Sequence, residues 1–210
     1  MRTRIKICGI TRAEDAAAAG ALGADAIGLV FYAASARAIS IDQARLIAAA
    51  TPPFVACVGV FLDADVAFVR EILACVPLNM LQFHGEESPA ICASFGRPYI
   101  KAIAMGAHID VAQYMARYRE AAGFLLDSHY PGQAGGLGIT LNWARVPART
   151  SRPLILAGGL DIGNVAQAVR KTQPYAVDVS SGVETAKGIK DAAKIKAFID
   201  EVKRVDCNQD

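Results

Sequence analysis

The sequence has no long hydrophobic run and no block of basic residues, and each absence excludes a class of protein. No apolar stretch reaches the roughly 18 residues that a membrane-spanning helix needs, and the first residues hold no apolar run long enough for a signal peptide. The formal net charge is only +2, with no basic–aromatic stripe, so nucleic acid is not expected as a partner. We therefore expect a soluble, cytoplasmic protein with no membrane partner.

Cysteine and histidine are too scattered for a disulfide framework or a local metal motif. The 5 cysteines are an odd number without a C-x-x-C pair, so we expect reduced thiols. The 3 histidines, His84, His108 and His129, form neither H-x-H nor H-E-x-x-H, so no metal ligand is predicted. A Ser-His-Asp triad is not expected either, because G-x-S-x-G is absent.

What the sequence does contain is a regular alternation of short apolar runs and Ala-rich helical stretches. Its 210 residues, 53% of them hydrophobic, suit one catalytic domain over residues 1–210 with a sheet buried on both faces. The predicted strands are Arg4–Cys8, Ala24–Phe31, Phe54–Phe61, Asn79–Phe83, Tyr99–Ile103, Gly123–Asp127, Leu154–Ala157 and Ala176–Val179. The predicted helices are 14–22, 41–50, 64–75, 87–94, 110–121, 141–146, 162–172 and 190–204. Units of about 25 residues predict an α/β fold, a compact (β/α)8 TIM barrel.

The last two predicted strands each open into small residues, which favours the barrel over an open doubly wound sheet. Gly158 and Gly159 follow one strand, and Ser180, Ser181 and Gly182 follow the other. Backbone N–H groups of such turns, with a helix N-terminus behind them, converge on an anion, and barrels bind phosphate here. A doubly wound sheet has the same alternation but carries G-x-G-x-x-G after its first strand, which this chain lacks.

Polar residues at the other strand ends are candidates for chemistry, because barrel enzymes place their catalytic groups there. Cys8 ends the first strand beside Gly9, which leaves room for a ligand; it is either a buried structural thiol or a general base. Arg37, in the loop after the second strand, is either a surface charge or a partner for a substrate carboxylate.

Three further strands contribute polar ends. Gln82 and His84 share one face of their strand and are either structural or substrate-binding. Asp127 either caps the next loop or acts as an acid, with apolar surroundings raising its pKa. Asp178 is expected to point into the barrel, where it orients a ligand or bonds the neighbouring loop. The glycine-rich segment 131–138 is expected to fold over the ligand.

With these residues placed, nearly the whole chain resembles the phosphoribosylanthranilate isomerase family. The motifs that carry the resemblance, in order, are Lys6-Ile-Cys-Gly-Ile-Thr11, Gly28-Leu-Val-Phe31, Ser35-Ala-Arg37, Val58-Gly-Val-Phe61, Gln82-Phe-His-Gly85, Leu126-Asp127, Gly135-Gly-Leu-Gly138, Leu156-Ala-Gly-Gly-Leu160, Asp178-Val-Ser-Ser-Gly-Val-Glu184 and Gly188-Ile-Lys-Asp191. The chain departs from the family pattern at Ala36, Leu137 and Ala186, all in loops.

The resemblance implies an Amadori rearrangement of N-(5-phosphoribosyl)anthranilate, a small phosphorylated aminosugar, in tryptophan biosynthesis and without a cofactor. It makes Asp127 the acid that opens the sugar ring, Cys8 the base that removes the C2 proton, and Arg37 the anchor of the anthranilate carboxylate. It assigns phosphate binding to the two turns.

Three alternatives stay open against this expectation. The related Amadori isomerase of histidine biosynthesis would have an aspartate where Cys8 stands. Indole-glycerol-phosphate synthase would need a lysine–glutamate set and an extra N-terminal helix, and neither is expected from this sequence. A phosphate-ligand binding protein without turnover would use the same barrel, because fold does not fix function. No exposed apolar helix face stands out, so a monomer is expected.

Overall fold

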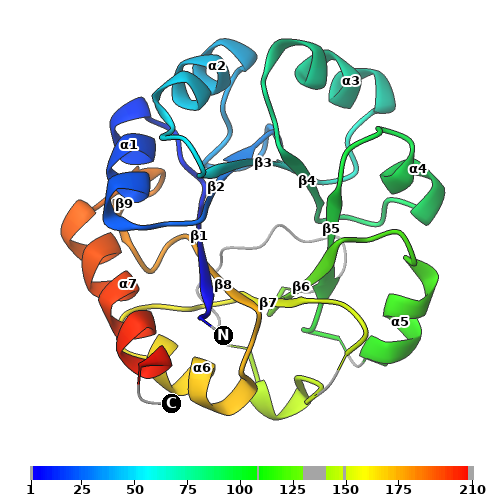
Figure 1. Ribbon diagram of the computed structural model, residues 1–210. Coiled ribbons are helices and arrows are strands. Elements are labelled where there is room, and N and C mark those ends of the chain that lie inside the picture. Colours follow the sequence, from blue (N-terminus) through cyan, green and yellow to red (C-terminus); the bar gives the residue numbers. More distant parts are fainter. Residues whose placement is uncertain (1, 108, 130–140, 149, 208–210) are drawn as a thin grey trace.

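The computed structural model describes residues 2–107, 109–129, 141–148 and 150–207. Within them, eight parallel strands close into a barrel, which Figure 1 shows along its axis with the helices outside. The strands are β1 Arg4–Cys8, β2 Ala26–Val30, β3 Ala56–Phe61, β4 Met80–Phe83, β5 Tyr99–Ala104, β6 Gly123–Asp127, β7 Leu154–Leu156 and β8 Ala176–Val179. The helices are α1 Ala13–Leu22, α2 Ile41–Ala50, α3 Val66–Cys75, α4 Pro89–Ala93, α5 Val111–Arg117, α6 Val165–Thr172 and α7 Ala192–Asp206. The predicted barrel is confirmed.

Closure of the barrel joins the first strand to the last. In β1, Lys6 lies opposite Asp178 of β8 on one side, and Cys8 lies opposite Gly28 of β2 on the other. Because alternate residues of a strand face the same side, Lys6 and Cys8 both point into the barrel. The closure therefore places charged and reactive groups from both ends of the chain next to one another.

The segments around the last strands differ from the sequence prediction. Between β6 and β7, the helix predicted at 141–146 is only a short 3₁₀ helix, η1 (Trp143–Arg145). After β8 the chain forms an antiparallel hairpin, β9 (Glu184–Ala186) and β10 (Ile189–Lys190), before α7 begins. Gly188 takes a φ of 81° in this hairpin, a conformation that favours glycine. Within the described segment 150–207, no helix begins directly after the turn of Ser180 and Ser181, contrary to the prediction.

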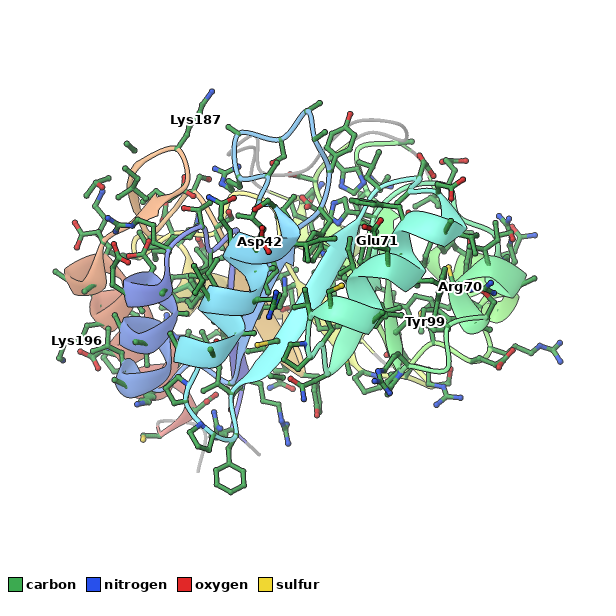
Figure 2. The ribbon with its side chains drawn as sticks, turned by 90° about the horizontal axis from the view of Figure 1, so that it is seen from above. Asp42, Arg70, Glu71, Tyr99, Lys187 and Lys196 are labelled. Carbon is green, nitrogen blue, oxygen red and sulfur yellow. The ribbon has the colours of Figure 1, made fainter. Side chains whose placement is uncertain are left out.

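Apolar side chains fill two layers. The smaller lies inside the barrel: its buried members are Ile100, Ala102, Leu125, Ile155, Ala157 and Ala176. The larger lies between the strands and the helices, and Figure 2 shows these helices from the side. Local caps define the helix starts; Ser40 and Gln43, for example, form a capping box at α2. None of the helices among the described residues is long and apolar enough to cross a membrane.

Candidate active site

The carboxyl ends of the strands surround a pocket of about 770 Å³, counted out to its open mouth. The predicted site residues that line it are Cys8, Arg37, Gln82, His84, Asp127, Gly158, Gly159, Asp178, Ser180 and Ser181. Gly182 lies next to this lining, in the same turn as Ser181. The structure thus brings the predicted residues to one place.

Cys8 is the buried thiol of this pocket, and a lysine that the sequence analysis did not single out lies beside it. Lys6 donates from Nζ to both carboxylate oxygens of Asp178, each at 2.9 Å, and both side chains are buried. Burial raises the pKa of Cys8 and the charge of Asp178 raises it further, while the charge and N–H donors of Lys6 lower it; the net direction is upward. The thiol therefore needs its positive neighbours to act as a base.

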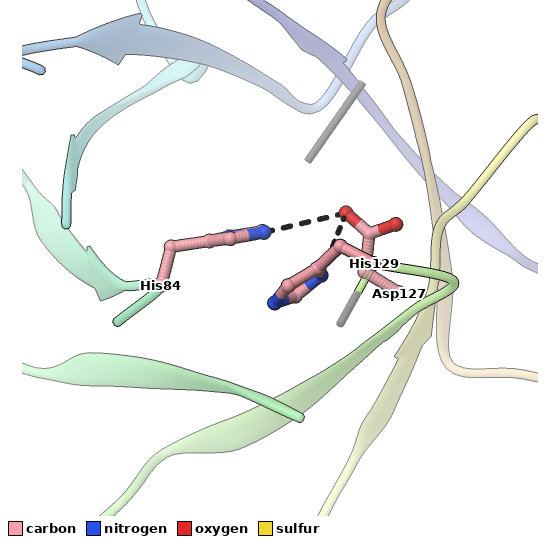
Figure 3. A group of neighbouring side chains, drawn as sticks. All are labelled: His84, Asp127 and His129. Carbon is pink, nitrogen blue, oxygen red and sulfur yellow. Dashed lines mark ion pairs between the residues drawn. The ribbon is translucent and has the colours of Figure 1, made fainter. Parts of the chain in front are cut away.

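Asp127, at the end of β6, lies against two imidazoles (Figure 3). Its Oδ2 is 3.3 Å from Nε2 of His84 and 3.7 Å from Nδ1 of His129. Burial raises the pKa of Asp127, but the close approach of His129 and His84 outweighs burial and brings this pKa below its usual range. The expectation that apolar surroundings raise the pKa was wrong, because β4 and the end of β6 bring both imidazoles to the same carboxylate oxygen.

Gln82 determines which ring nitrogen of His84 carries the proton when the imidazole is neutral. The Gln82 amide nitrogen lies 3.1 Å from Nδ1 of His84, and a donated bond there makes Nδ1 an acceptor. A neutral imidazole then carries its proton on Nε2, the atom that faces Asp127. Gln82 is buried, and its expected placement on the same face as His84 is confirmed.

The His84–Asp127–His129 cluster is the one group of possible metal ligands among the described residues. Its ligand atoms lie within 4.8 Å of one another. The two imidazole rings are stacked, with centroids 4.4 Å apart and 29° between their planes. Both ring nitrogens face the same oxygen of Asp127, so the cluster can share a proton.

Arg37 crosses the pocket to the hairpin after β8. Its Nε and Nη2 donate to the two carboxylate oxygens of Glu184 at 2.8 and 2.9 Å. The backbone of Gly9, with φ of 74°, makes room for it: a Cβ there would lie 2.4 Å from Cδ of Arg37. The sequence analysis expected the room beside Gly9 to admit a ligand, but the stem of Arg37 fills it.

Lys190 brings a buried positive charge beneath the last turn. Its Nζ donates to Glu184 Oε1 at 2.7 Å and to the backbone oxygen of Ser180 at 3.1 Å. Burial lowers the pKa of Lys190, against the opposing effect of the hydrogen bond and charge of Glu184. Glu184 thus holds Arg37 and Lys190 together.

The two small-residue turns lie side by side, as predicted. A β-bridge pairs Asp161 with Gly182 and joins the segment after β7 to the turn after β8. Gly158 and Gly159 take φ values of 81° and 62°, which favour glycine. A Cβ on Gly182 would lie 2.1 Å from the backbone oxygen of Leu160, so only glycine lets the turns approach this closely. Backbone N–H groups of such paired turns can bind an anion.

Other functional candidates escaped the sequence analysis or lie outside the described residues. Those missed are Lys6, His129, Glu184 and Lys190, although each stands within or next to a motif quoted above. Their positions in or beside these motifs were a signal of function. The residues that they contact, however, lie far away along the chain. The glycine-rich segment 131–138, with Leu137, falls outside the described residues, as does His108.

Comparison with known proteins gives consistent matches over almost the whole chain. The family model for N-(5'-phosphoribosyl)anthranilate (PRA) isomerase matches residues 5–201. An N-(5'-phosphoribosyl)anthranilate isomerase of Pseudomonas paraeruginosa is 56% identical over 200 residues, which cover 95% of each chain. That of Cellvibrio japonicus is 58% identical over 195 residues, covering 93% of this chain and 91% of the relative.

Solved structures of the same family have the same fold. Phosphoribosyl anthranilate isomerase from Thermus thermophilus is 38% identical, with a TM-score of 0.86, over 97% of this chain and all of that one. Another such isomerase, in complex with reduced 1-(o-carboxyphenylamino)-1-deoxyribulose 5-phosphate, is 39% identical, with a TM-score of 0.82, over 96% of this chain and 99% of that one. A third, described as monomers of a dimeric isomerase from Thermotoga maritima, is 37% identical, with a TM-score of 0.81, over 96% and 98% of the two chains.

Proposed function

This chain belongs to the N-(5'-phosphoribosyl)anthranilate isomerase family of aldose–ketose isomerases in tryptophan biosynthesis, and we propose that Cys8 and Asp127 are its base and acid. The reaction converts N-(5-phosphoribosyl)anthranilate to 1-(2-carboxyphenylamino)-1-deoxyribulose 5-phosphate. It needs one proton donor and one proton acceptor at a single sugar. The pocket supplies both, on β6 and β1.

In the first step Asp127 delivers to the ring oxygen of the furanose a proton that it shares with His84 and His129, because its own pKa is low. The bond from this oxygen to C1 breaks, and the anilino nitrogen donates its electron pair to C1, forming a protonated Schiff base. The Oδ2 atom of Asp127 faces ring nitrogens of His84 and His129, so these three side chains hold the proton together before it is transferred. The tautomer that Gln82 imposes directs the Nε2 proton of His84 toward Asp127.

In the second step the thiolate of Cys8 removes the proton from C2. The electron pair of that C–H bond forms a C1–C2 double bond, and the Schiff base nitrogen becomes neutral. The resulting enolamine takes a proton at C1 and loses one from the C2 hydroxyl, which gives the ketone. No electrons are exchanged with any other molecule, so the step needs only acid and base groups.

The two ends of the substrate are charged, and the pocket has a basic group or an anion-binding turn for each. Arg37 binds the anthranilate carboxylate through Nη1, because Glu184 occupies Nε and Nη2. The phosphate binds the backbone of the adjacent turns, with the charge of Lys190 beneath Ser180. Gln82, His84 and Asp178 line the space between these anchors and contact the sugar.

The observation that carries these roles is that one pocket holds Cys8, Asp127, Arg37 and both turns. The test is the loss of anthranilate-type fluorescence when purified protein meets phosphoribosylanthranilate generated in situ. Rapid decay is expected, and it should disappear in Asp127→Asn. If Asp127→Asn keeps the wild-type rate in a folded protein, Asp127 is not the acid. If the wild type also gives no decay, a silent binding protein becomes the better explanation.

We also propose that the chain works as one catalytic domain and as a monomer. Among the described residues, the exposed large apolar side chains come from different elements and loops of the fold: Leu46, Phe54, Phe68, Ile91, Tyr175 and Ile189. A relative from Thermotoga maritima is described as dimeric, so a dimer is the alternative. Sedimentation equilibrium decides the question, since a mass of 22.1 kDa is expected and twice that value contradicts the monomer.

A further inference from the structure

We propose that Lys6 is a positioning residue for Cys8: its ammonium, fixed in the barrel by Asp178, stabilises the thiolate form that accepts a proton. The inference rests on the proposed role of Cys8 as the base. It assigns a function to a lysine that lies inside the barrel and that neither acid–base step uses directly.

The barrel geometry brings the three groups together. Lys6 and Cys8 are separated by one residue of β1 and face the same side, and Asp178 lies opposite Lys6 on β8. Gly28 provides the room: a Cβ there would lie 2.6 Å from Sγ of Cys8 and 3.2 Å from Nζ of Lys6. The sulfur and the ammonium therefore border the same small space.

A lysine in this position has to be paired. Its side chain is 6% exposed, and an isolated ammonium is costly to bury. Burial lowers the pKa of Lys6, but the negative charges of Asp178 and of the Cys8 thiolate outweigh burial and raise it. Lys6 thus stays charged, and it has an ammonium with three N–H donors for two anionic neighbours.

The other charged groups around Cys8 do not replace Lys6. Lys190, on β10, lowers the pKa of Cys8 by its charge alone. Arg37 is also attracted to the thiolate, but its Nε and Nη2 already donate to Glu184. Asp178 opposes thiolate formation. Lys6 is the cation whose Nζ borders the same space at Gly28 as the sulfur of Cys8.

The two partners of this ion pair therefore shift the pKa of Cys8 in opposite directions: Lys6 lowers it and Asp178 raises it. Removing the charge of Lys6 should make the thiolate harder to form, whereas removing the charge of Asp178 should make it easier. Two other groups act on Asp178 itself: the charge of Asp127 raises the pKa of Asp178, and that of His84 lowers it. A purely structural ion pair predicts instead that breaking it from either end has the same effect.

The experiment measures alkylation of Cys8 by iodoacetamide between pH 6 and 10, with the modified peptide quantified by mass spectrometry. Exposed Cys75 and Cys207 in the same sample report the intrinsic reactivity of the reagent. In Lys6→Met the rate at pH 8 should fall by about tenfold or more, the equivalent of one pKa unit. In Asp178→Asn it should rise, and Lys6→Arg should restore much of the wild-type rate.

Two further variants keep the result interpretable. Lys6→Gln removes the charge but leaves an N–H donor for Asp178, so it serves if Lys6→Met does not fold. Lys187→Met removes an exposed lysine at the tip of the hairpin, which extends from the edge of the molecule in Figure 2, and should change nothing. Circular dichroism confirms that each variant is folded.

The outcomes separate this inference from the proposed function. Equal or same-direction shifts in folded Lys6→Met and Asp178→Asn, or no shift in either, overturn the role of Lys6 even if the wild type turns substrate over. Opposite shifts in a protein that shows no turnover support the effect on the thiol while the assignment of Cys8 as a base fails. Alkylation needs no substrate, so the two results are independent.

Discussion

Arg37 and Glu184 meet through two parallel hydrogen bonds, Nε and Nη2 of the guanidinium to the two carboxylate oxygens at 2.8 and 2.9 Å. Both side chains are largely buried, at 12% and 6% exposure. A planar guanidinium held in this way has one orientation, and its remaining Nη1 donors point away from Glu184. The pair therefore fixes the direction from which a second carboxylate can approach Arg37.

Glu184→Gln should weaken substrate binding without removing a group that takes part in the proton transfers. We expect KM to rise by about tenfold while kcat changes less than twofold, since lost uniform binding raises KM alone. Steady-state kinetics measures both constants. Glu201→Gln is the matched control, because it breaks an exposed ion pair with Arg204 at the surface. An equal fall in kcat and kcat/KM for Glu184→Gln would place Glu184 in the chemical step instead.

Cys8→Ala should lower kcat by about 10²- to 10⁴-fold, the usual contribution of a positioned general base. The pH dependence has a definite sign. The thiolate is the active form and burial raises the pKa of Cys8, so kcat/KM should rise with pH and level off only above the usual titration of a cysteine. Cys75→Ser, at an exposed position, is the control. A kcat/KM that falls between pH 7 and 9 contradicts the assignment.

Gln82→Leu should remove the preference of His84 for one tautomer. Without the amide at Nδ1, the proton of a neutral imidazole distributes between both nitrogens, and Nε2 no longer presents a donor to Asp127 at all times. We expect kcat to fall by about tenfold. Nitrogen-15 NMR of labelled histidine should show a protonated Nε2 for His84 in the wild type and a mixture in the variant. An unchanged tautomer in the variant shows that Gln82 does not set it.

Gly182→Ala should separate the two phosphate-binding turns. The new Cβ would lie 2.1 Å from the backbone oxygen of Leu160, so the turn has to move. We expect KM to rise by at least about tenfold, because misplaced N–H groups bind the phosphate poorly. Gly163→Ala in the same region is the control: its Cβ would contact only Asp161 Oδ1, at 3.3 Å. Equal KM values for the two variants contradict a phosphate site at Gly182.

Lys101→Met should destabilise the fold. Lys101 is fully buried outside the barrel, where Nζ donates to the backbone oxygens of Phe83 and Gly85 and to Oε2 of Glu87 at 2.9 Å. Its loss leaves Glu87 buried without its cation, which costs about 3–5 kcal/mol. Urea unfolding measures the change. Lys196→Met, at an exposed position labelled in Figure 2, should cost less than about 0.5 kcal/mol. Equal losses of unfolding free energy in the two variants would show that burial of Lys101 does not account for the effect.

The sequence by itself determined the barrel and most of the pocket lining. Apolar runs alternate with helical stretches, and parallel strands of a closed sheet all end at the same rim. A polar residue at a strand end therefore has a known place: Cys8 and Asp127 were placed in one pocket without knowledge of any contact between them. The small residues after β7 and β8 were paired on the same reasoning.

Only the tertiary structure decided which side chains become partners. Lys6 meets Asp178 across 172 residues and Arg37 meets Glu184 across 147, because β1 closes on β8 and the hairpin after β8 folds over the rim. The direction of the pKa shift of Asp127 depended in the same way on His84 and His129. Strand order fixes at which end of the barrel a side chain lies, but its charge environment depends on distances of a few ångströms. Those distances follow from strand register, side-chain rotamers and loop packing, which no local spacing encodes.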